Sequence, residues 1–522
     1  MREQHGSPGA SGPGARGAPV NGRGRAVGRG AVAPIAAFLL VLGALAPPAQ
    51  SALAQEASPQ SGAPPTAAES AATQVPLRPD QVALLQRTLA QAETHGFAHN
   101  AYTPAGLDAA LASRDPGARR QGQAALVGAV LRYAHDVRVG RLGPSDFPHL
   151  WGLRPQPYDA SAEFVAAVNQ DRLGPWLDSL PPPYTGYDTL RRGLAIYRGI
   201  AAHGGWPALS DTALAPGARG PSVAALRARL AIEDSAVPTA GDAYDQALSD
   251  AVSRAQKRYG LEPTGQLDKS TIAALNVPVS QRVAQIIANM ERWRWLPREL
   301  PSDRIQVNIA AAILTVFHND TPTLAMRAVT GRPGDETPML SSVISDVLFN
   351  PPWNVPADIA AKELWPKERA HPGYFARNEF VVIHTPDGGT RLQQKAGDMS
   401  ALGHVKFEFP NPYSVYLHDT PTHSTFGRYA RMVSHGCVRL EKPVVLADAV
   451  MQGDPKWTSD EINQTIASGQ TVRAPIPRPI SVFLLYWTAF ASADGQMSFR
   501  GDPYSWDHLL MQRIDAVPHS VT

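Results

Sequence analysis

The stretch 414-SVYLHDTPTHSTFGRYARMVSHGCVRLEKPVV-445 changes its side-chain pattern twice and decides the fold of the C-terminal half. Its first residues alternate, with Leu417 on one face and His418 on the other, which is typical of a half-buried strand. The Ser-His-Gly segment indicates a tight turn, and Pro443 suits the first turn of a helix. We therefore expect His418 at the end of a strand and Cys437 in a turn ahead of a helix.

Cys437 is the single cysteine of the 522 residues and follows His418 by nineteen positions. A thiol in such a turn lies near free backbone N–H groups and a helix N-terminus, which favour the thiolate and can hold an oxyanion. We interpret Cys437 as a nucleophile for acyl carbon and His418 as its base. The backbone N–H groups of Gly436 and Cys437 are the candidate oxyanion donors. The backbone carbonyl of Asp419 is the candidate acceptor for the second imidazole nitrogen.

Two other interpretations of this cysteine need to be weighed. A lone cysteine is usually a buried, inert side chain, but that does not explain a thiol preceded by His435 and Gly436. A zinc site would use His418, His423, His435 and Cys437. Histidines five residues apart across a Thr-Pro turn, with one thiolate, match no regular ligand spacing. We therefore expect no metal and no other cofactor.

The N-terminal region has the order of a secretory signal. Arginines without carboxylates over residues 16–29 precede an apolar run at 34–46, and small residues lead up to Ala54. The run is shorter than the roughly 20 residues that span a bilayer, so we expect a cleaved signal peptide over residues 1–54. Residues 55–76 are rich in Ala, Ser, Pro and Gln, and we expect a disordered linker there.

The predicted signal peptide implies that the mature chain lies in the periplasm or cell envelope. We expect contact with the membrane only if the signal is kept as an anchor. One cysteine excludes an internal disulfide, so ordinary cores must stabilise the exported chain. The length suggests about three domains of roughly 150 residues each. A net charge of +2 argues against a nucleic-acid partner.

The middle of the chain is predicted to be helical. Residues 77–210 contain apolar stripes at helical spacing, such as Leu126, Val130 and Tyr133, and no convincing strand. Residues 211–278 predict a compact three-helix unit. Residues 279–302 predict a connecting helix.

Residues 303–510 change to short runs rich in β-branched side chains, "DRIQVNI", "AILTVF", "TLAMRAVTG" and "SVISDVLFN". We expect a mostly-β domain from this change of pattern. A stretch rich in Pro, Gly and charge over about residues 357–403 interrupts it. That stretch predicts an inserted subdomain or long lid rather than more sheet.

The segment around His418 and Cys437 resembles the motif of a known enzyme family. The segment "HDTPTHSTFGRYARMVSHGCVRL" is similar to the His…Ser-His-Gly-Cys signature of L,D-transpeptidases, cysteine enzymes that cross-link peptidoglycan. With "ERWRWLP", "NPPWNVP", "LRYAHDVRVGRLGP" and other flanks, the chain resembles the large periplasmic murein L,D-transpeptidases from about Leu77 to Asp507. The unit at 211–278 resembles a peptidoglycan-binding domain, although Ala255 stands where that family usually has an aromatic residue.

The resemblance implies a multidomain α+β fold with a helical scaffold, a three-helix peptidoglycan-binding domain and a mostly-β catalytic domain carrying an inserted capping subdomain. It implies that Cys437 is the nucleophile and His418 the proton-transfer histidine. His404 stands where we would expect an arginine. The motif residues that position these groups are Ser434, His435 and Gly436, and the candidate substrate-binding residues are Tyr416, Arg439 and Trp353.

The reaction implied by the resemblance is acyl transfer between peptidoglycan stems, in cell-wall organisation and cell shape. Cys437 attacks the third-residue carbonyl of a tetrapeptide stem, releases D-alanine and passes the acyl group to an amine of another stem, giving a 3→3 cross-link. Water, a free D-amino acid or a lipoprotein lysine as acceptor would make a carboxypeptidase, an exchange enzyme or a tethering enzyme. Stem peptides, glycan and other cell-wall synthases are the expected partners, and carbapenems the expected inhibitors.

Two further classes compete with this hypothesis. A wall-binding module with a dead catalytic domain would not need an intact histidine–cysteine pair. A papain-type protease would place its cysteine early, before a helix, with the histidine far downstream. Here the histidine precedes the cysteine on predicted β-structure, so neither class is favoured.

Overall fold

The structure is a computed structural model that describes residues 66–491 and 495–516. The predicted signal peptide over residues 1–54 lies outside the described residues. The predicted linker lies outside them up to residue 65.

The rest of the predicted linker includes a short helix, α1 (Ala67–Ala72), so the prediction of disorder is wrong there. Thr66 and Glu69 form a capping box at its first turn, and Ala72 is buried. Composition predicted disorder because the stretch lacks large apolar residues. The cap satisfies N–H groups that such a short helix would otherwise leave open.

The predicted helical region has a hydrophobic core of its own, in which Leu85, Leu126 and Phe164 are fully buried. The side chain of Asp115 accepts two backbone N–H groups and fixes the start of the longest helix. These observations confirm the helical prediction. The helices are α2 (Pro79–Ala90), α3 (Leu107–Ala112), α4 (Pro116–Val139), α5 (Ser161–Asn169) and α6 (Leu173–Ser179).

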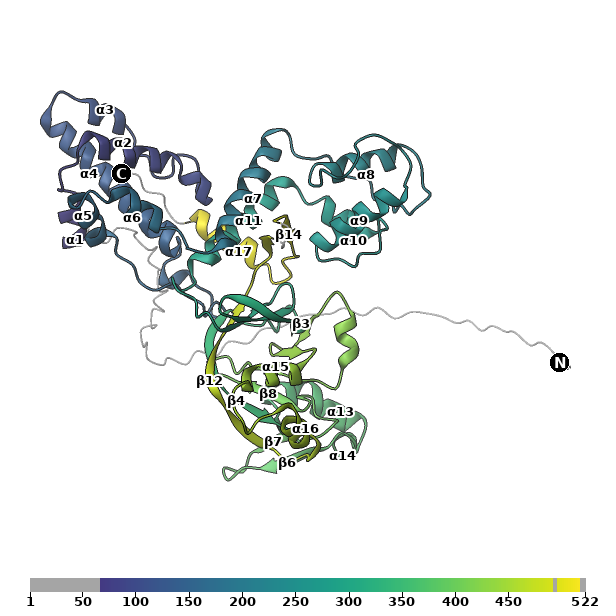
Figure 1. The fold of residues 1–522 in the computed structure, drawn as a ribbon. Coiled ribbons are helices and arrows are strands. Elements are labelled where there is room, and N and C mark those ends of the chain that lie inside the picture. Colours follow the sequence, from purple (N-terminus) through teal and green to yellow (C-terminus); the bar gives the residue numbers. More distant parts are fainter. Residues whose placement is uncertain (1–65, 492–494, 517–522) are drawn as a thin grey trace, which may run out of the picture. The chain divides into compact units, whose positions relative to one another are not determined.

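Helix α11 (Val279–Arg294) was expected only to connect domains, yet all its residues from Gln285 to Arg294 are buried. It packs beside α7 (Thr185–Ala202) and contacts α17 (Trp506–Ala516) (Figure 1). Its Glu291 carboxylate lies 2.6 Å from the Arg294 guanidinium. A charge is tolerated in such a position only when it is paired, so this helix is built for the interior.

The three-helix unit is formed by α8 (Pro221–Ala231), α9 (Gln246–Arg258) and α10 (Lys269–Leu275). The side chains of Asp245 and Asp268 accept backbone N–H groups at the starts of α9 and α10. N-caps of this kind typically stabilise a helix by about 1 kcal/mol.

The C-terminal half contains a nine-stranded sheet with the order β10-β3-β11-β9-β8-β4-β12-β1-β2. Strand β2, at one end of this order, also pairs with β3, so the sheet closes on itself. The four runs predicted as strands form β1 to β4. The strands are β1 (Arg304–Asn308), β2 (Ile313–His318), β3 (Thr321–Gly331), β4 (Leu340–Phe349), β8 (Val405–Glu408), β9 (Leu417–His418), β10 (Met432–Ser434), β11 (Val438–Leu440) and β12 (Val472–Leu485).

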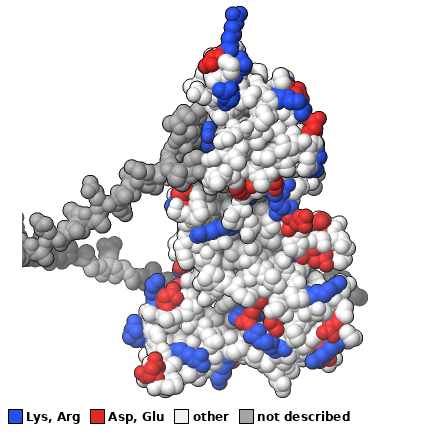
Figure 2. Space-filling view, turned by 90° about the vertical axis from the view of Figure 1, so that its left-hand side faces the viewer, with Lys and Arg blue, Asp and Glu red and all other residues white. Residues whose placement is uncertain are grey.

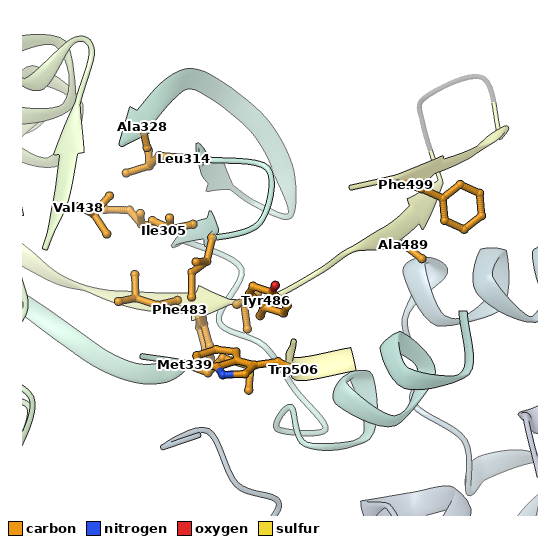
Figure 3. Packing of buried hydrophobic residues seen from close by; sticks show 14 of the residues in the cluster. Ile305, Leu314, Ala328, Met339, Val438, Phe483, Tyr486, Ala489, Phe499 and Trp506 are labelled. Carbon is orange, nitrogen blue, oxygen red and sulfur yellow. The ribbon is translucent and has the colours of Figure 1, made fainter. Parts of the chain in front are cut away.

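The main hydrophobic core lies inside this closed sheet. Figure 3 shows Ile305, Leu314, Ala328 and Val438 pointing toward one another from β1, β2, β3 and β11. All four are fully buried, and the cluster continues past Tyr486 to the helices. The alternate residues of the same strands therefore face outward, and the candidate active site is built on that outer face.

The inserted stretch forms a small unit with its own core, which includes Leu364, Phe375 and Leu392. It contains a separate three-stranded sheet, so the expectation of no further sheet is wrong. The short apolar run "FVVIH" lies among prolines and charged residues, which masked it as a strand. Its strands are β5 (Trp353–Asn354), β6 (Phe380–His384) and β7 (Thr390–Gln394), and its helices are α12 (Ala357–Ile359), η3 (Ala360–Leu364, a π-helix), α13 (Trp365–Ala370) and α14 (Tyr374–Arg377).

The remaining elements are α15 (Pro443–Met451), α16 (Ser459–Ala467), β13 (Ala489–Ala491), β14 (Met497–Phe499) and the short 3-10 helices η1 (Ala92–His95), η2 (Pro144–Asp146) and η4 (His423–Gly427). Among the described helices, none has the length and apolar character needed to cross a membrane. Figure 2 shows basic and acidic side chains interspersed on one face, with uncharged areas between them.

Candidate active site

Strand pairing places the cysteine and the histidine on one face of the sheet. Strands β9 and β11 are parallel neighbours, in which Arg439 lies opposite His418 and Val438 opposite Leu417. Leu417 and Val438 are fully buried in the core. Residues opposite each other share a face and residues two apart repeat it, so Cys437, two before Arg439, lies on the face of His418.

Two more side chains complete this face. Lys406 of β8 lies opposite His418, and its ammonium is 4.1 Å from the centre of the Tyr416 ring. The Tyr416 and His418 rings meet edge to face, with centroids 5.5 Å apart. The Lys406 ammonium is also 2.6 Å from the carboxylate of Glu408. The outer face around the cysteine is therefore aromatic and cationic.

The turn that carries Cys437 is closed by its own hydrogen bonds. The Ser434 hydroxyl donates to the carbonyl of Cys437 at 2.6 Å and accepts the N–H of Gly436 at 3.2 Å. The Thr337 hydroxyl donates to the carbonyl of Gly436 at 2.7 Å. Gly436 has φ +108°, where a side chain would be strained. Ser434 and Gly436 thus fix the backbone on which the thiol stands.

These bonds change the expected set of oxyanion donors. The N–H of Gly436 is occupied by Ser434, contrary to the expectation that it would be free. The N–H of Cys437 has no acceptor in the part of the chain that the structure describes. Cys437 therefore offers the better-placed backbone donor of the two.

The Cys437 thiol is free and half-buried, with Sγ 3.9 Å from the carbonyl of Ser414. Burial raises its pKa above the ordinary value, although the backbone and hydroxyl of Tyr416 and the cations Lys406 and Arg439 oppose the shift. The expectation of a turn that favours the thiolate is wrong in direction. Burial, which the sequence does not display, outweighs the donors.

His418 is buried, and its pKa is lowered to about 3 by burial first and by Arg439 and Lys406 next. It is therefore neutral at neutral pH and has a lone pair that can accept a proton. The backbone carbonyls of Asp419 and Leu402 oppose the shift. Neither makes a hydrogen bond with Nδ1, which has no partner among the described residues.

Asp419 does not direct its carboxylate at that ring. Its two oxygens accept the N–H of Thr420 at 2.7 Å and the N–H of His404 at 2.8 Å. The His404 ring in turn contacts Asn350 at 3.1 Å and Asp398 at 3.1 Å. Asp419 therefore shapes the loop after β9, and its influence on His418 comes through the backbone.

His435 is held by a residue that the sequence did not indicate. Its Nε2 lies 2.6 Å from the carboxylate of Glu363, in helix η3 of the insertion. The Arg332 guanidinium approaches the same carboxylate at 3.5 Å. Burial would raise the pKa of Glu363, but the His435 hydrogen bond and nearby cations outweigh it and lower the pKa. A separation of 72 residues leaves no spacing signal for this pair.

The candidate substrate-binding residues surround the thiol. The pKa of Tyr416 is raised well above its usual range, by burial first and then by Cys437, while a hydrogen bond from Trp353 opposes the shift. Trp353 opens the insertion, so Tyr416 touches both the thiol and the inserted unit. Arg439 is half-buried, and burial lowers its pKa while Cys437 opposes that shift.

The four side chains considered for zinc are not gathered. His423 is mostly exposed and lies 3.8 Å from Asp419, while His435 is paired with Glu363. Across residues 66–491 and 495–516, no group of three or more His, Cys, Asp or Glu side chains is arranged to hold a metal ion. The arrangement is instead that of a thiol and a neutral imidazole on adjacent strands.

Comparison with known families matches three segments of the chain. Residues 302–457 match the L,D-transpeptidase catalytic domain, residues 77–194 match the scaffold domain, and residues 219–275 match a family described as "Putative peptidoglycan binding domain". These matches agree with the resemblance noted in the sequence and place both His418 and Cys437 inside the catalytic-domain match.

Among curated proteins, the chain is similar to a protein of Haemophilus influenzae described as "Putative L,D-transpeptidase". The two are 33% identical over 248 residues, which cover 44% of this chain and 49% of the relative. The chain thus matches about half the length of that relative.

Solved structures give weaker matches. L,D-transpeptidase 3 of Mycobacterium tuberculosis is 15% identical, covering 35% of this chain and 61% of that chain with a TM-score of 0.19. An L,D-transpeptidase from Xylanimonas cellulosilytica is 16% identical, covering 53% of this chain and 98% of that chain with a TM-score of 0.16. Similarity this low adds nothing to the family matches.

Proposed function

We propose that this chain, whose residues 302–457 belong to the L,D-transpeptidase catalytic domain family, is a peptidoglycan L,D-transpeptidase with Cys437 as nucleophile and His418 as base. One observation carries the proposal: the thiol and a neutral, buried imidazole lie on the same face of neighbouring strands. The match of residues 219–275 to a peptidoglycan-binding family supports the same polymer as substrate.

The first half-reaction forms a thioester. Cys437 passes its proton to His418 as Sγ attacks the third-residue carbonyl of a tetrapeptide stem. The N–H of Cys437 donates to the tetrahedral oxygen. The C–N bond to the terminal D-alanine breaks, and His418 returns the proton to the leaving amine. Thiol and imidazole both start neutral, because burial disfavours the charged form of each.

The second half-reaction transfers the acyl group. A side-chain amine of another stem attacks the thioester and gives one proton to His418, which returns it to the leaving sulfur. The products are a 3→3 cross-link and the free thiol. Water as acceptor would make the same site a carboxypeptidase, and a lipoprotein lysine would make it a tethering enzyme.

Peptidoglycan lies outside the cytoplasmic membrane, so domains that act on it imply an extracytoplasmic location. We propose that residues 1–54 direct export to the periplasm and are cleaved. Mass spectrometry of the mature N-terminus tests this, with a first residue near Gln55 expected. A mature chain that begins at Met1 would contradict it.

Purified chain incubated with disaccharide tetrapeptides should release D-alanine and give 3→3 dimers, read by mass spectrometry. Cys437→Ala should do neither while keeping the wild-type circular dichroism spectrum, because a small side chain replaces a small side chain. D-alanine release without dimers would select the carboxypeptidase instead. Undiminished dimer formation by Cys437→Ala would exclude the cysteine mechanism.

A covalent inhibitor offers a second test of the same thiol. A thiolate can open a strained β-lactam and remain attached as a thioester, and the family resemblance favours carbapenems. We expect one carbapenem adduct per chain on Cys437, slower in His418→Ala. Absence of an adduct, while small alkylators still modify Cys437, would count against a cleft shaped for stems.

A further inference from the structure

A cavity lies on the outer face of the closed sheet, and its lining includes none of the residues of the cysteine turn. Its volume is about 820 Å³, within the usual range of ligand sites. Its floor is formed by the outward residues of β1 and β2, including Gln306 and Thr315, whose neighbours Ile305 and Leu314 face the core. Its walls come from the start of α7, the end of α11 and β13.

Aromatic rings line one side of this cavity. Trp293 and Trp487 stack in parallel, with ring centroids 4.5 Å apart and planes 12° apart. Tyr184 meets Trp293 at 5.4 Å, and Phe317 and Phe490 complete the lining. Trp487, Tyr184, Phe317 and Phe490 are only partly buried. An aromatic platform left half-open to a cavity offers flat apolar faces to a ligand.

Of the four charged residues that line the cavity, Arg298, Arg304 and Asp320 have partners, and Glu299 is exposed. The Arg304 guanidinium lies 2.5 Å from the Asp320 carboxylate. Arg298 donates to the backbone carbonyls of Leu180 and Pro181 at 3.1 Å and 2.6 Å. Both cations of the lining therefore have partners among the described residues, and the exposed Glu299 carboxylate is the remaining charge.

Neutral polar groups remain available beside the rings. Asn308 uses its oxygen for the N–H groups of Ala311 and Trp487, and its amide nitrogen has no partner among the described residues. The side chains of Gln306 and Thr315 have no hydrogen-bond partner within residues 66–491 and 495–516. Amide and hydroxyl groups next to stacked aromatic rings are suited to a neutral ligand that has apolar faces and many hydroxyl or amide groups.

We propose that this cavity binds the glycan backbone of peptidoglycan, a chain of β-linked N-acetylated amino sugars. The C–H faces of pyranose rings pack on tryptophan and tyrosine, and the hydroxyl and acetamido groups pair with Gln306, Asn308 and Thr315. A stem peptide carries free carboxylates, for which the lining offers no unpaired cation among the described residues and, in Glu299, a like charge. The inference rests on the proposed function only for the identity of the polymer.

The cavity is connected to the catalytic turn through one strand. Strand β3 pairs with β2 on one side and with β11 on the other, and neighbouring strands lie about 4.8 Å apart. The Thr330 hydroxyl of β3 donates to the carbonyl of Ile309, the residue after Asn308, at 3.2 Å. Thr337 links the N–H of the adjacent Gly331 at 2.8 Å to the carbonyl of Gly436 at 2.7 Å. A sugar chain held here would keep its stems near Cys437.

Binding can be tested apart from chemistry in the full chain carrying Cys437→Ala. Calorimetric titration with the tetramer of β-1,4-linked N-acetylglucosamine should show binding. Gln306→Ala and Trp487→Ala, each added to that background, should weaken it about tenfold. Trp365→Ala, a partly buried tryptophan of the insertion, is the matched control and should leave binding unchanged. If Trp487→Ala does not fold, Phe490→Ala replaces it.

Kinetics with an active cysteine separate this inference from the proposed reaction. Gln306→Ala should raise KM about tenfold for a disaccharide tetrapeptide, with kcat unchanged, and leave KM for the free tetrapeptide as in wild type. A wild type that binds the sugar tetramer but releases no D-alanine would overturn the reaction and leave the glycan site standing. No binding of the tetramer, equal affinity in both cavity variants, or an equal rise in KM for the free tetrapeptide would overturn the glycan site.

Discussion

Two histidines flank the same cysteine, and their surroundings differ. His418 is buried on β9, has a pKa lowered to about 3 and leaves Nδ1 without a partner. His435 lies in the turn, is partly exposed and is bound by Glu363 of the insertion at 2.6 Å. A base must be free to take and return a proton, whereas a residue tied to a carboxylate can hold two parts of a protein together. The two regions therefore suit proton transfer and positioning, respectively.

The largest expected effect is on the catalytic rate, which should depend on His418 far more than on another histidine. His418→Ala should lower D-alanine release by 10²–10⁴-fold, the usual contribution of a general base. The matched control is His423→Ala, which removes a mostly exposed histidine 3.8 Å from Asp419 and should change the rate less than twofold. Steady-state release of D-alanine measures both. Equal losses in the two variants would place the base elsewhere, with His435 as the next candidate.

The next effect concerns the thiol beside these histidines. Because burial raises the Cys437 pKa, alkylation by iodoacetamide should be slow at neutral pH. Its rate should rise about tenfold per pH unit until the raised pKa is reached. The rate is followed by intact mass from pH 6 to 10.5. A plateau already reached at pH 6 would mean a preformed thiolate and contradict the neutral resting pair.

The contact between His435 and Glu363 should have a smaller effect. Both side chains are about a third exposed, so loss of the contact between them should cost ~1 kcal/mol, about fivefold in kcat/KM. Glu363→Gln keeps the shape of the side chain and removes its charge. Glu368→Gln is the control within the insertion, because the Glu368 carboxylate accepts the backbone N–H groups of Gly373 and Phe375 and does not contact His435. A loss as large as that of His418→Ala would assign Glu363 a direct part in catalysis.

The smallest expected effect is on stability against acid. The folded pKa of His418, about 3, lies below the ordinary value near 6.5, so the folded chain binds fewer protons between these values. Its contribution to stability is present above pH 6.5 and is lost as pH falls toward 3. His418→Gln should flatten the fall of Tm over this window by a few degrees. Burial lowers the pKa of His95 to about 3 as well, so His95 should still make Tm fall with pH in the His418→Gln variant.

A melting curve of His418→Gln as steep as wild type would contradict the neutral buried imidazole. His423→Ala serves as the reference, because it removes a histidine whose side chain is mostly exposed.

The residue pattern was sufficient for the strands and for the side of the sheet on which His418 lies. The β-branched runs predicted strands β1 to β4. The alternation through Leu417 and His418 predicted that the histidine lies on the face opposite Leu417, and the strand pairing leads to the same placement. Both results follow from local periodicity, which a sequence displays directly.

What the sequence did not display depends on packing between distant residues. Glu363 meets His435 only because the insertion folds back to the turn. The raised pKa of Cys437 comes from burial, which outweighs the opposing effects of Tyr416, Lys406 and Arg439. Gly436 lost its expected role because a side chain two residues away accepts its N–H. Such effects depend on the three-dimensional packing of the chain and leave no signal in the spacing of residues along the sequence.

One measurement tests the central claim most directly: intact-protein mass spectrometry of the chain mixed with a tetrapeptide substrate and quenched in acid. The account predicts an adduct of the stem minus D-alanine on Cys437 in wild type. The adduct should form slowly in His418→Ala and be absent in Cys437→Ala. An adduct that persists in Cys437→Ala, or D-alanine release by wild type with no adduct on this residue at any time, would contradict it.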